Sequence, residues 1–372
     1  MPNAIIVATS NESIRPSWHA ILLGSAICFG FGAAGSAPAS ALTINTIYSA
    51  SVNNLGNATE VKAAFQRAIA TYQNMFANPV TINLQVGWGE LLGSPVTSLG
   101  VAGMTGYGTY SYSQMQTMLR ATSTSASDQT AYANFPATSP IAAGTFTLTP
   151  ALAKAIGVAG ASSSIDGYIG FGSGYNFDFN RTDGITTGSY DFTGVALHEI
   201  SHALGRVSGL GHSGATNGLP IDLFRYQAPA SSSFSYNEPA YFSINGGQTN
   251  LATFNASGTA DRDSWVAMPG DAFSAFASPG VINDLSAADK IVMDVLGWNT
   301  VIGSTTPTTT PTTTSGGRKT RTTRRAQEET DTGNAFASNS TDVPEPASMA
   351  LLASALIGLG IASRRRRAVS GQ

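Results

Sequence analysis

Three of the four histidines in this 372-residue chain lie in one short segment. The segment contains His198-Glu-Ile-Ser-His202 and a third imidazole at His212, whereas the fourth histidine, His19, lies near the N-terminus. Imidazole is the commonest metal ligand in proteins and the side chain that titrates nearest to neutral pH. Because most of the imidazoles are concentrated here, we expect metal or proton-transfer chemistry in this segment.

The spacing of His198 and His202 predicts a helical metal site. Residues four apart lie on one face of an α-helix with Cβ atoms about 5–6 Å apart, so the two imidazoles can converge on one ion. Glu199 lies roughly 100° further round the helix, where it can reach a water bound to the metal. In zinc hydrolases with this H-E-x-x-H arrangement, the ion lowers the pKa of its water to about 7 and the glutamate takes the proton.

A catalytic zinc site normally has three protein ligands and one open position, so a third ligand is required. His212 is the first candidate, because Gly205 ends the predicted helix and Gly209 and Gly211 allow the chain to fold back. Asp222 is the second candidate, because a carboxylate oxygen is also an acceptable zinc ligand.

The residues from His198 to Gly205 resemble the metzincin clan of secreted metallopeptidases, in particular its matrixin-like and serralysin-like members. The clan's pattern is H-E-x-x-H-x-x-G-x-x-H, and Ser208 stands where its last histidine would fall. The resemblance implies zinc-dependent endopeptidase activity and a methionine turn beneath the metal. Met268 is a candidate for that turn, although Phe273 lies about where such a turn would precede the last helix. The implied fold is α+β and metzincin-like, with a twisted sheet, an active-site helix, a largely irregular C-terminal subdomain and a closing helix.

Periodicity predicts the elements that would position this motif. Residues 59–76 have a helical apolar face with Thr59 as its cap, and residues 80–86 alternate as a half-buried strand. We expect residues 213–284 to be mostly irregular, and a capping box at Ser286-Ala-Ala-Asp289 to open a closing helix that ends at Gly297. Further strands are expected at 43–48, 106–112 and 167–171, and further helices at 113–120 and 149–156. Residues 167–171 are also a candidate exposed edge for pairing with extended peptides.

The N-terminal segment is typical of an exported protein. Residues 1–41 combine a weakly basic start, an apolar run and a small-residue exit, which predicts a signal peptide. Cys28 within it is the only cysteine, so the metallopeptidase domain predicted at residues 42–301 has no thiol catalysis, no cysteine-ligated zinc and no disulfide.

The C-terminal segment resembles the PEP-CTERM sorting signal of Gram-negative bacteria. Residues 302–342 are Thr/Pro-rich and then basic, which predicts a disordered linker. Residues 343–372 contain Val343-Pro-Glu-Pro346, an apolar stretch and Arg364–Arg367. The resemblance implies processing by an exosortase, a transient inner-membrane anchor and release to the cell envelope or the extracellular space. A simple membrane anchor is the alternative.

Residues 42–301 contain nine Lys and Arg against sixteen Asp and Glu, a net charge of −7. This balance argues against a nucleic-acid-binding core. Carboxylates near 180–184 predict either a Ca²⁺ site or a plain polar turn. Tyr226 and Arg206 are candidates for polarising a substrate carbonyl, with ordinary packing as the alternative.

Together these observations predict a secreted zinc endopeptidase acting on protein or peptide substrates, with His198, His202 and His212 as metal ligands and Glu199 as general base. The main alternative is a non-catalytic surface or biofilm-matrix protein with a structural zinc site. A zinc hydrolase acting on a non-peptide amide is a third hypothesis that the same motif allows.

Overall fold

The computed structural model describes residues 41–210, 217–236, 238–256, 261–266 and 268–301, together with the backbone of Val343–Pro344. Among these residues, no helix combines the length and the apolar character that a membrane span requires. Nearly all of the predicted signal peptide, the linker and most of the sorting signal lie outside the described residues.

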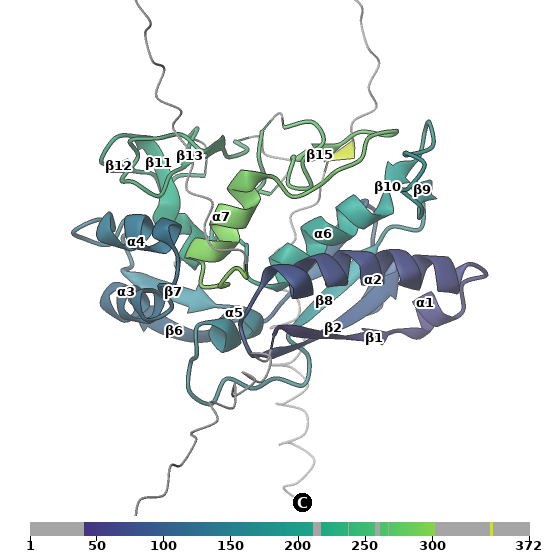
Figure 1. The fold of residues 1–372 in the computed structure, drawn as a ribbon, viewed down its shortest axis with the longest axis horizontal. Coiled ribbons are helices and arrows are strands. Elements are labelled where there is room, and N and C mark those ends of the chain that lie inside the picture. Colours follow the sequence, from purple (N-terminus) through teal and green to yellow (C-terminus); the bar gives the residue numbers. More distant parts are fainter. Residues whose placement is uncertain are drawn as a thin grey trace, which may run out of the picture. The chain divides into compact units, whose positions relative to one another are not determined.

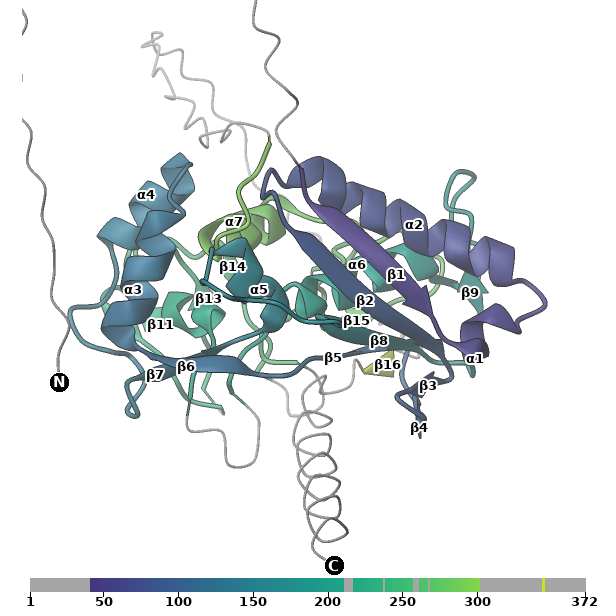
Figure 2. The ribbon, with the colours of Figure 1, turned by 90° about the horizontal axis from the view of Figure 1, so that it is seen from below.

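A four-stranded sheet lies beneath the histidine motif (Figures 1 and 2). Its strand order is β1-β2-β8-β5, with bounds Thr43–Tyr48, Thr81–Trp88, Gly167–Phe171 and Gly100–Gly103. The first three strands are parallel, whereas β5 runs antiparallel to β8. Alternate side chains of β2 are buried, namely Ile82, Leu84 and Val86. This is the period-2 pattern of a strand with one packed face.

The strand order corrects one expectation. Strand β8 lies between β2 and β5, so residues 167–171 do not form the exposed edge that we expected. The outer strand on that side is β5, which no pattern in the sequence predicted. Its Gly-Val-Ala-Gly sequence is too short to show an alternating pattern.

Two helices cover the same face of this sheet (Figure 2). They are α2 (Ala58–Met75) and α6 (Phe192–Ala203), and a short α1 (Ala50–Asn53) precedes α2. The hydroxyl of Tyr72 on α2 donates a 2.7 Å hydrogen bond to the carbonyl of Leu197 on α6. Helix α2 confirms the predicted apolar face, but it begins after Asn57 instead of using Thr59 as its cap.

A second group of elements follows β5 in the chain. Strands β6 (Tyr107–Ser111) and β7 (Thr145–Leu148) pair antiparallel, and three helices accompany them. These helices are α3 (Tyr112–Ala121), α4 (Ala126–Ala133) and α5 (Pro150–Ala155). Each has a Ser or Thr side chain that accepts a hydrogen bond from its first turn, which is a favourable N-cap. Helix α4 was not predicted.

The described residues from 217 to 301 form the C-terminal part of the structure. This part contains more regular secondary structure than we expected for residues 213–284. The 3-10 helix η1 (Pro220–Phe224) leads into a small sheet of order β12-β11-β13-β14. These strands span Ser231–Ser232, Arg225–Ala228, Tyr241–Phe242 and Ala252–Thr253. Three further two-stranded ladders complete the structure: β3–β4 (Glu90–Leu91 with Ser94–Pro95), β9–β10 (Phe177–Asp178 with Tyr190–Asp191) and β15–β16 (Phe276–Ala277 with Val343–Pro344).

The closing helix is α7 (Ala287–Val295), and it has the predicted capping box of Ser286 and Asp289. Gly297 follows it with a φ of +104°, a left-handed conformation that favours glycine. The indole of Trp298 then donates to the carbonyl of Leu204 at 3.0 Å, which ties the end of α7 to the end of α6.

A buried carboxyl group lies where helices α4 and α7 meet. The hydroxyl of Ser125, the N-cap of α4, donates to Oδ2 of Asp294 at 2.5 Å. Burial raises the pKa of Asp294 to about 6, although the hydrogen bond from Ser125 acts in the opposite direction. The folded state therefore binds this proton more tightly than the unfolded chain does, where an aspartate has a pKa of about 3.9.

We expect Asp294 to make the free energy of unfolding fall as the pH rises from about 4 to about 6, because the folded protein must ionise a buried group over that interval. Asp294→Asn removes this titration and should reduce the pH dependence by about 1–3 kcal/mol. Urea unfolding at pH 4 and pH 7 measures the difference, with the exposed Asp183→Asn as control. The same pH dependence in the wild type and Asp294→Asn would contradict the prediction.

Candidate metal centre

Helix α6 carries the histidine motif, and all of its residues are buried. The helix lies in the interior, between the sheet and the C-terminal part (Figure 1), so its polar side chains are enclosed by protein. Asp191 occupies the N-cap position, but its carboxylate pairs with Arg181 and accepts from the amide of Asn283 instead of capping the helix. Gly194 allows the segment containing Asn283 to approach, because a Cβ there would lie 2.8 Å from the Asn283 carbonyl oxygen.

The C-terminal end of α6 is a Schellman turn. The amide of Gly205 donates to the carbonyl of His202 at 2.9 Å, and the amide of Arg206 donates to the carbonyl of Ser201 at 3.0 Å. Gly205 has the left-handed φ of +108° that this turn requires. The turn brings the carbonyl of Arg206 back to the His202 ring, 2.7 Å from Nδ1.

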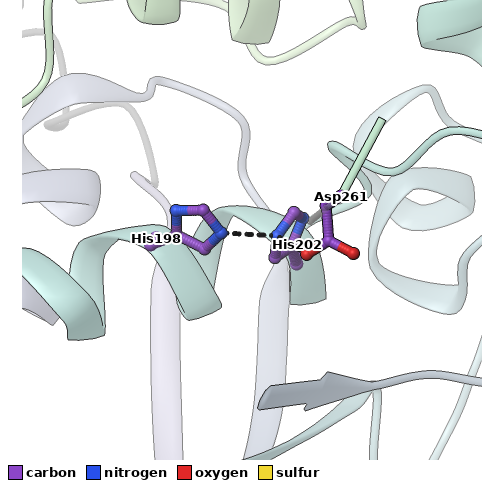
Figure 3. Close-up of side chains that lie close together, drawn as sticks. All are labelled: His198, His202 and Asp261. Atoms are coloured by element: carbon purple, nitrogen blue, oxygen red, sulfur yellow. Dashed lines mark hydrogen bonds and ion pairs between the residues drawn. The ribbon is translucent and has the colours of Figure 1, made fainter. Parts of the chain in front are cut away.

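The two imidazoles face each other through their Nε2 atoms, which are 2.8 Å apart (Figure 3). Nδ1 of His198 lies 2.7 Å from the carbonyl oxygen of Ala272, and Nδ1 of His202 makes the equivalent contact with Arg206. A carbonyl oxygen only accepts hydrogen bonds, so both Nδ1 atoms carry a proton. When both rings are neutral, each Nε2 presents a lone pair to the other. That arrangement is favourable only with a cation or a proton between them.

The surroundings of the pair favour a single positive charge. Burial lowers the pKa of His198 to about 3, and the neighbouring His202 acts in the same direction. Burial also disfavours charge on His202, but the carboxylates of Asp263 and Asp261 raise the pKa of His202 to about 10. The charge can be a proton on His202 or a bound cation that displaces it.

Asp261 completes a set of three possible metal ligands (Figure 3). Its Oδ2 lies 3.4 Å from Nε2 of His202, and its side chain is 10% exposed. The three candidate ligand atoms of His198, His202 and Asp261 all lie within 4.8 Å of one another. Zinc binds imidazole nitrogen and carboxylate oxygen, so these three side chains would be chemically suitable ligands for it. No other such group of three or more His, Cys, Asp or Glu occurs in the described part of the chain.

Glu199 lies against the outer strand of the sheet. Its side chain is buried, and a Cβ placed on Gly100 of β5 would come within 2.5 Å of Glu199 Oε1. The glycine at position 100 therefore makes room for the carboxylate between α6 and β5. This contact places the predicted general base beside the strand that forms the edge of the sheet.

An aromatic ring lies against the histidines where the resemblance implied a methionine. Phe273 stacks on His198 with ring centroids 4.5 Å apart and an interplanar angle of 16°, and it meets His202 edge-on at 5.6 Å. Its neighbour Ala272 supplies the carbonyl that binds Nδ1 of His198. Met268, the methionine considered for this position, packs against the edge of the hydrophobic core.

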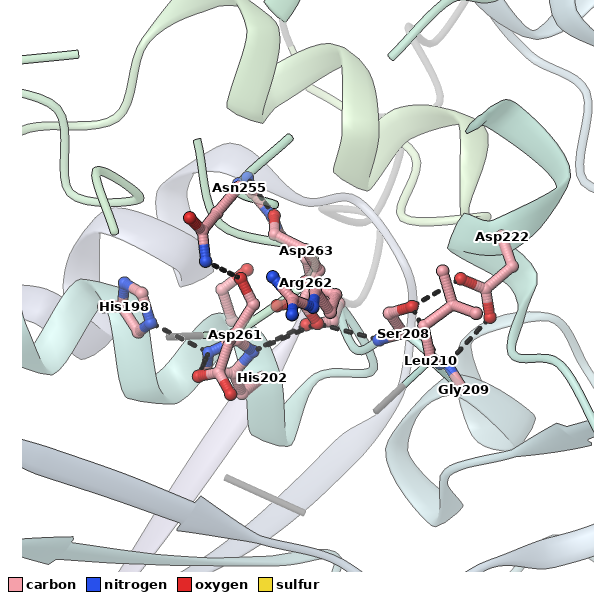
Figure 4. A network of polar contacts seen from close by, with 12 residues as sticks. His198, His202, Ser208, Gly209, Leu210, Asp222, Asn255, Asp261, Arg262 and Asp263 are labelled. Atoms are coloured by element: carbon pink, nitrogen blue, oxygen red, sulfur yellow. Dashed lines mark hydrogen bonds and ion pairs between the residues drawn. The ribbon is translucent and has the colours of Figure 1, made fainter. Parts of the chain in front are cut away.

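The two predicted third ligands have different outcomes. His212 lies outside the described residues. Asp222 is buried and engaged elsewhere: its carboxylate accepts from the Ser208 hydroxyl at 2.6 Å and from the amide of Gly209 at 2.7 Å (Figure 4). It also accepts from the amide of Leu219 at 2.9 Å. These bonds tie together the two sides of the loop that follows α6, so the structure gives Asp222 a role in holding that loop.

Asp261 was missed because no local pattern marks it. It lies far along the chain from His202, in a Gly/Ser/Asn-rich region without periodicity. The available signal was the Asp-Arg-Asp263 cluster, since charged residues are rare in that region. Asp263 supports the loop by accepting from the amide of Ser208 at 2.8 Å (Figure 4).

Of the two residues considered for polarising a substrate carbonyl, Arg206 contacts this group through its own carbonyl, 2.7 Å from Nδ1 of His202. Tyr226 is buried in β11, where it pairs with Tyr241 and Ser232. In the turn considered for Ca²⁺, the side chain of Asn180 contacts Asp183, and the carboxylate of Asp178 accepts from Thr186 and from the amide of Asn180. These contacts account for the turn as a network of polar side chains.

Comparison with known proteins identifies the C-terminal segment. Residues 342–367 match the family model of the PEP-CTERM protein-sorting motif. No curated protein and no solved structure matches the chain. The match confirms the predicted sorting motif, which implies export, C-terminal membrane-anchor processing and recognition by an exosortase-type processing enzyme. The mixed α+β architecture is likewise observed, while the metzincin fold and the peptidase activity stay predictions.

Proposed function

We propose that this protein is an exported, zinc-dependent peptidase in which His198, His202 and Asp261 bind the metal. The observation that carries the proposal is the pair of Nε2 atoms that face each other at 2.8 Å while both Nδ1 atoms donate to carbonyls. Neutral rings in this arrangement expose two lone pairs to one point. A buried carboxylate beside them supplies the negative charge that a divalent cation favours.

Glu199 is the proposed general base. When bound, zinc would supply Lewis acidity that polarises the scissile carbonyl and brings the pKa of a water to about 7. Glu199 would take a proton from that water while the water oxygen bonds to the carbonyl carbon. It would then give the proton to the leaving nitrogen as the carbon–nitrogen bond breaks. The contact with Gly100 limits the positions that the carboxylate can adopt.

Strand β5 is the proposed binding edge for the substrate. It forms one end of the sheet order, and its first residue, Gly100, contacts the Glu199 carboxylate. An extended peptide added beside β5 would form main-chain hydrogen bonds and carry its carbonyls past Glu199. On this proposal the substrate is an extended peptide.

One observation favours the alternative of a non-catalytic matrix or surface protein with a structural zinc site. His198 and His202 are only 1% and 0% exposed. Structural zinc sites are closed by four protein ligands, whereas catalytic sites keep one position open. Zinc content and hydrolysis therefore have to be measured together, and zinc without cleavage would support the alternative.

Glu199→Gln should retain zinc and lose hydrolysis. The amide keeps the size of the side chain but cannot accept the proton, so kcat should fall by about 10²- to 10⁴-fold. Zinc stoichiometry by mass spectrometry and cleavage of a peptide library, with and without a chelator, measure the two properties. The exposed helix residue Glu60 provides a matched control, because Glu60→Gln should change neither. Wild-type cleavage that survives complete zinc removal, or unchanged kcat in Glu199→Gln, would contradict the mechanism.

Asp261→Asn should weaken zinc binding more than Asp222→Asn or His212→Ala does. Loss of the ligand charge should cost more than the about 10- to 100-fold that supporting residues contribute to metal affinity. Asp222→Asn should lower the free energy of unfolding by about 1–3 kcal/mol, because it leaves buried donors facing an amide, yet it should keep zinc. His212→Ala should also keep zinc.

Competition with a chromophoric chelator measures these zinc affinities. A large loss in His212→Ala together with normal affinity in Asp261→Asn would identify His212 as the third ligand and refute the assignment of Asp261.

A further inference from the structure

Arg206 is a buried cation directly after the histidine helix. Its side chain is fully buried, and Nη1 lies 2.6 Å from Oδ1 of Asp289, which is also buried. The same carboxylate oxygen accepts a 2.7 Å hydrogen bond from the indole of Trp265. The other oxygen of Asp289 accepts from Ser286 in the capping box of α7. The ion pair therefore joins the end of α6 to the start of α7.

Arg206 also contacts each part of the chain that positions a candidate ligand. Its carbonyl accepts from Nδ1 of His202. Its guanidinium carbon lies 3.3 Å from the ring centroid of Phe273, and that ring stacks on His198. Its Nη2 donates at 3.3 Å to the carbonyl of Asp263, in the segment that carries Asp261.

A contribution to stability alone is a weak explanation for this arrangement. Removing two charges from water costs several kcal/mol per ion, and well-packed apolar residues often replace a buried pair without loss of stability. An apolar side chain could fill the volume of Arg206, but it could not donate to Asp289 and Asp263 at once. The planar guanidinium can make both contacts and still stack on an aromatic face.

We propose that Arg206 is a positioning residue of the metal centre. It holds His198, His202 and the segment of Asp261 in the geometry that binds zinc. This inference rests on the proposed function. Arg206 acts on His202 through its own carbonyl, on His198 through the Phe273 ring, and on the Asp261 segment through the Asp263 carbonyl. Asp289 and Trp265 fix the guanidinium in the one orientation that makes these contacts together.

The test compares Arg206→Lys with a matched substitution at the other end of the same helix. Arg206→Lys keeps a cation beside Asp289 but loses the planar group over Phe273 and the fixed second donor. Arg181→Lys makes the same chemical change in the ion pair with Asp191, at the N-terminal end of α6. Zinc affinity by chelator competition, the visible spectrum of the Co²⁺-substituted protein and the thermal midpoint of the zinc-free protein are measured for each variant.

We expect Arg206→Lys to weaken zinc binding by about 10- to 100-fold and to change the Co²⁺ spectrum, because the ligands lose their supporting contacts. Arg181→Lys should leave both properties unchanged. Phe273→Leu, an apolar change that preserves a packed core, is the second variant. If Arg206 acts on His198 through this ring, the effects of Arg206→Lys and Phe273→Leu on zinc affinity should be non-additive in a double-mutant cycle.

The outcomes separate this inference from the proposed function. Wild-type protein that binds no zinc overturns both. If the wild type binds zinc and the zinc affinity of Arg206→Lys is no weaker than that of Arg181→Lys, the positioning role is overturned but the proposed function is not. If Arg206→Lys does not fold, an unchanged zinc affinity and Co²⁺ spectrum in Phe273→Leu overturn the role, whereas a weakened affinity with a changed spectrum supports it.

Discussion

Two backbone carbonyls determine what the histidine pair can bind. Each accepts the Nδ1 proton of one ring, so both Nε2 atoms are left to face a common point inside the protein. The carbonyl for His202 is local, because the glycine turn after α6 returns Arg206 to its ring. The carbonyl for His198 comes from Ala272, 74 residues further along the chain. The ligand geometry therefore requires the C-terminal part to be docked on the helix.

The sequence predicted those features that a local pattern specifies. The strand at 80–86, the helix at 59–76 and the capping box at Ser286 each have a periodicity or a capping residue of their own, and each is present. The i, i+4 spacing of His198 and His202 predicted their common face in the same way. These features depend only on residues within a few turns of one another, so neighbouring residues are sufficient to predict them.

The features that the sequence did not predict depend on contacts between distant segments. Asp222 and Asp261 are the same residue type, and no spacing rule in the sequence separates them. The backbone amides that engage Asp222 and the imidazole beside Asp261 are defined only once the chain has folded. Phe273 was noted for its position before the last helix, but its stacking on His198 likewise depends on how the C-terminal part packs. The position of β5 at the edge depends on the order of the strands in the sheet. The sequence of a four-residue strand contains no pattern that predicts this order.

The origin of the third candidate ligand changes how metal binding and folding are linked. A ligand on the turn after α6 would close a local loop and leave the C-terminal part independent of the metal. Asp261 instead belongs to a region whose strands are two to four residues long and contain no cysteine. Such short strands form few main-chain hydrogen bonds, so this region depends on buried side chains such as Asp263 and Asp222 that reach the segment after α6. An ion shared by His198, His202 and Asp261 would add a bond between the same two parts. Its binding free energy would then contribute to the stability of the folded state.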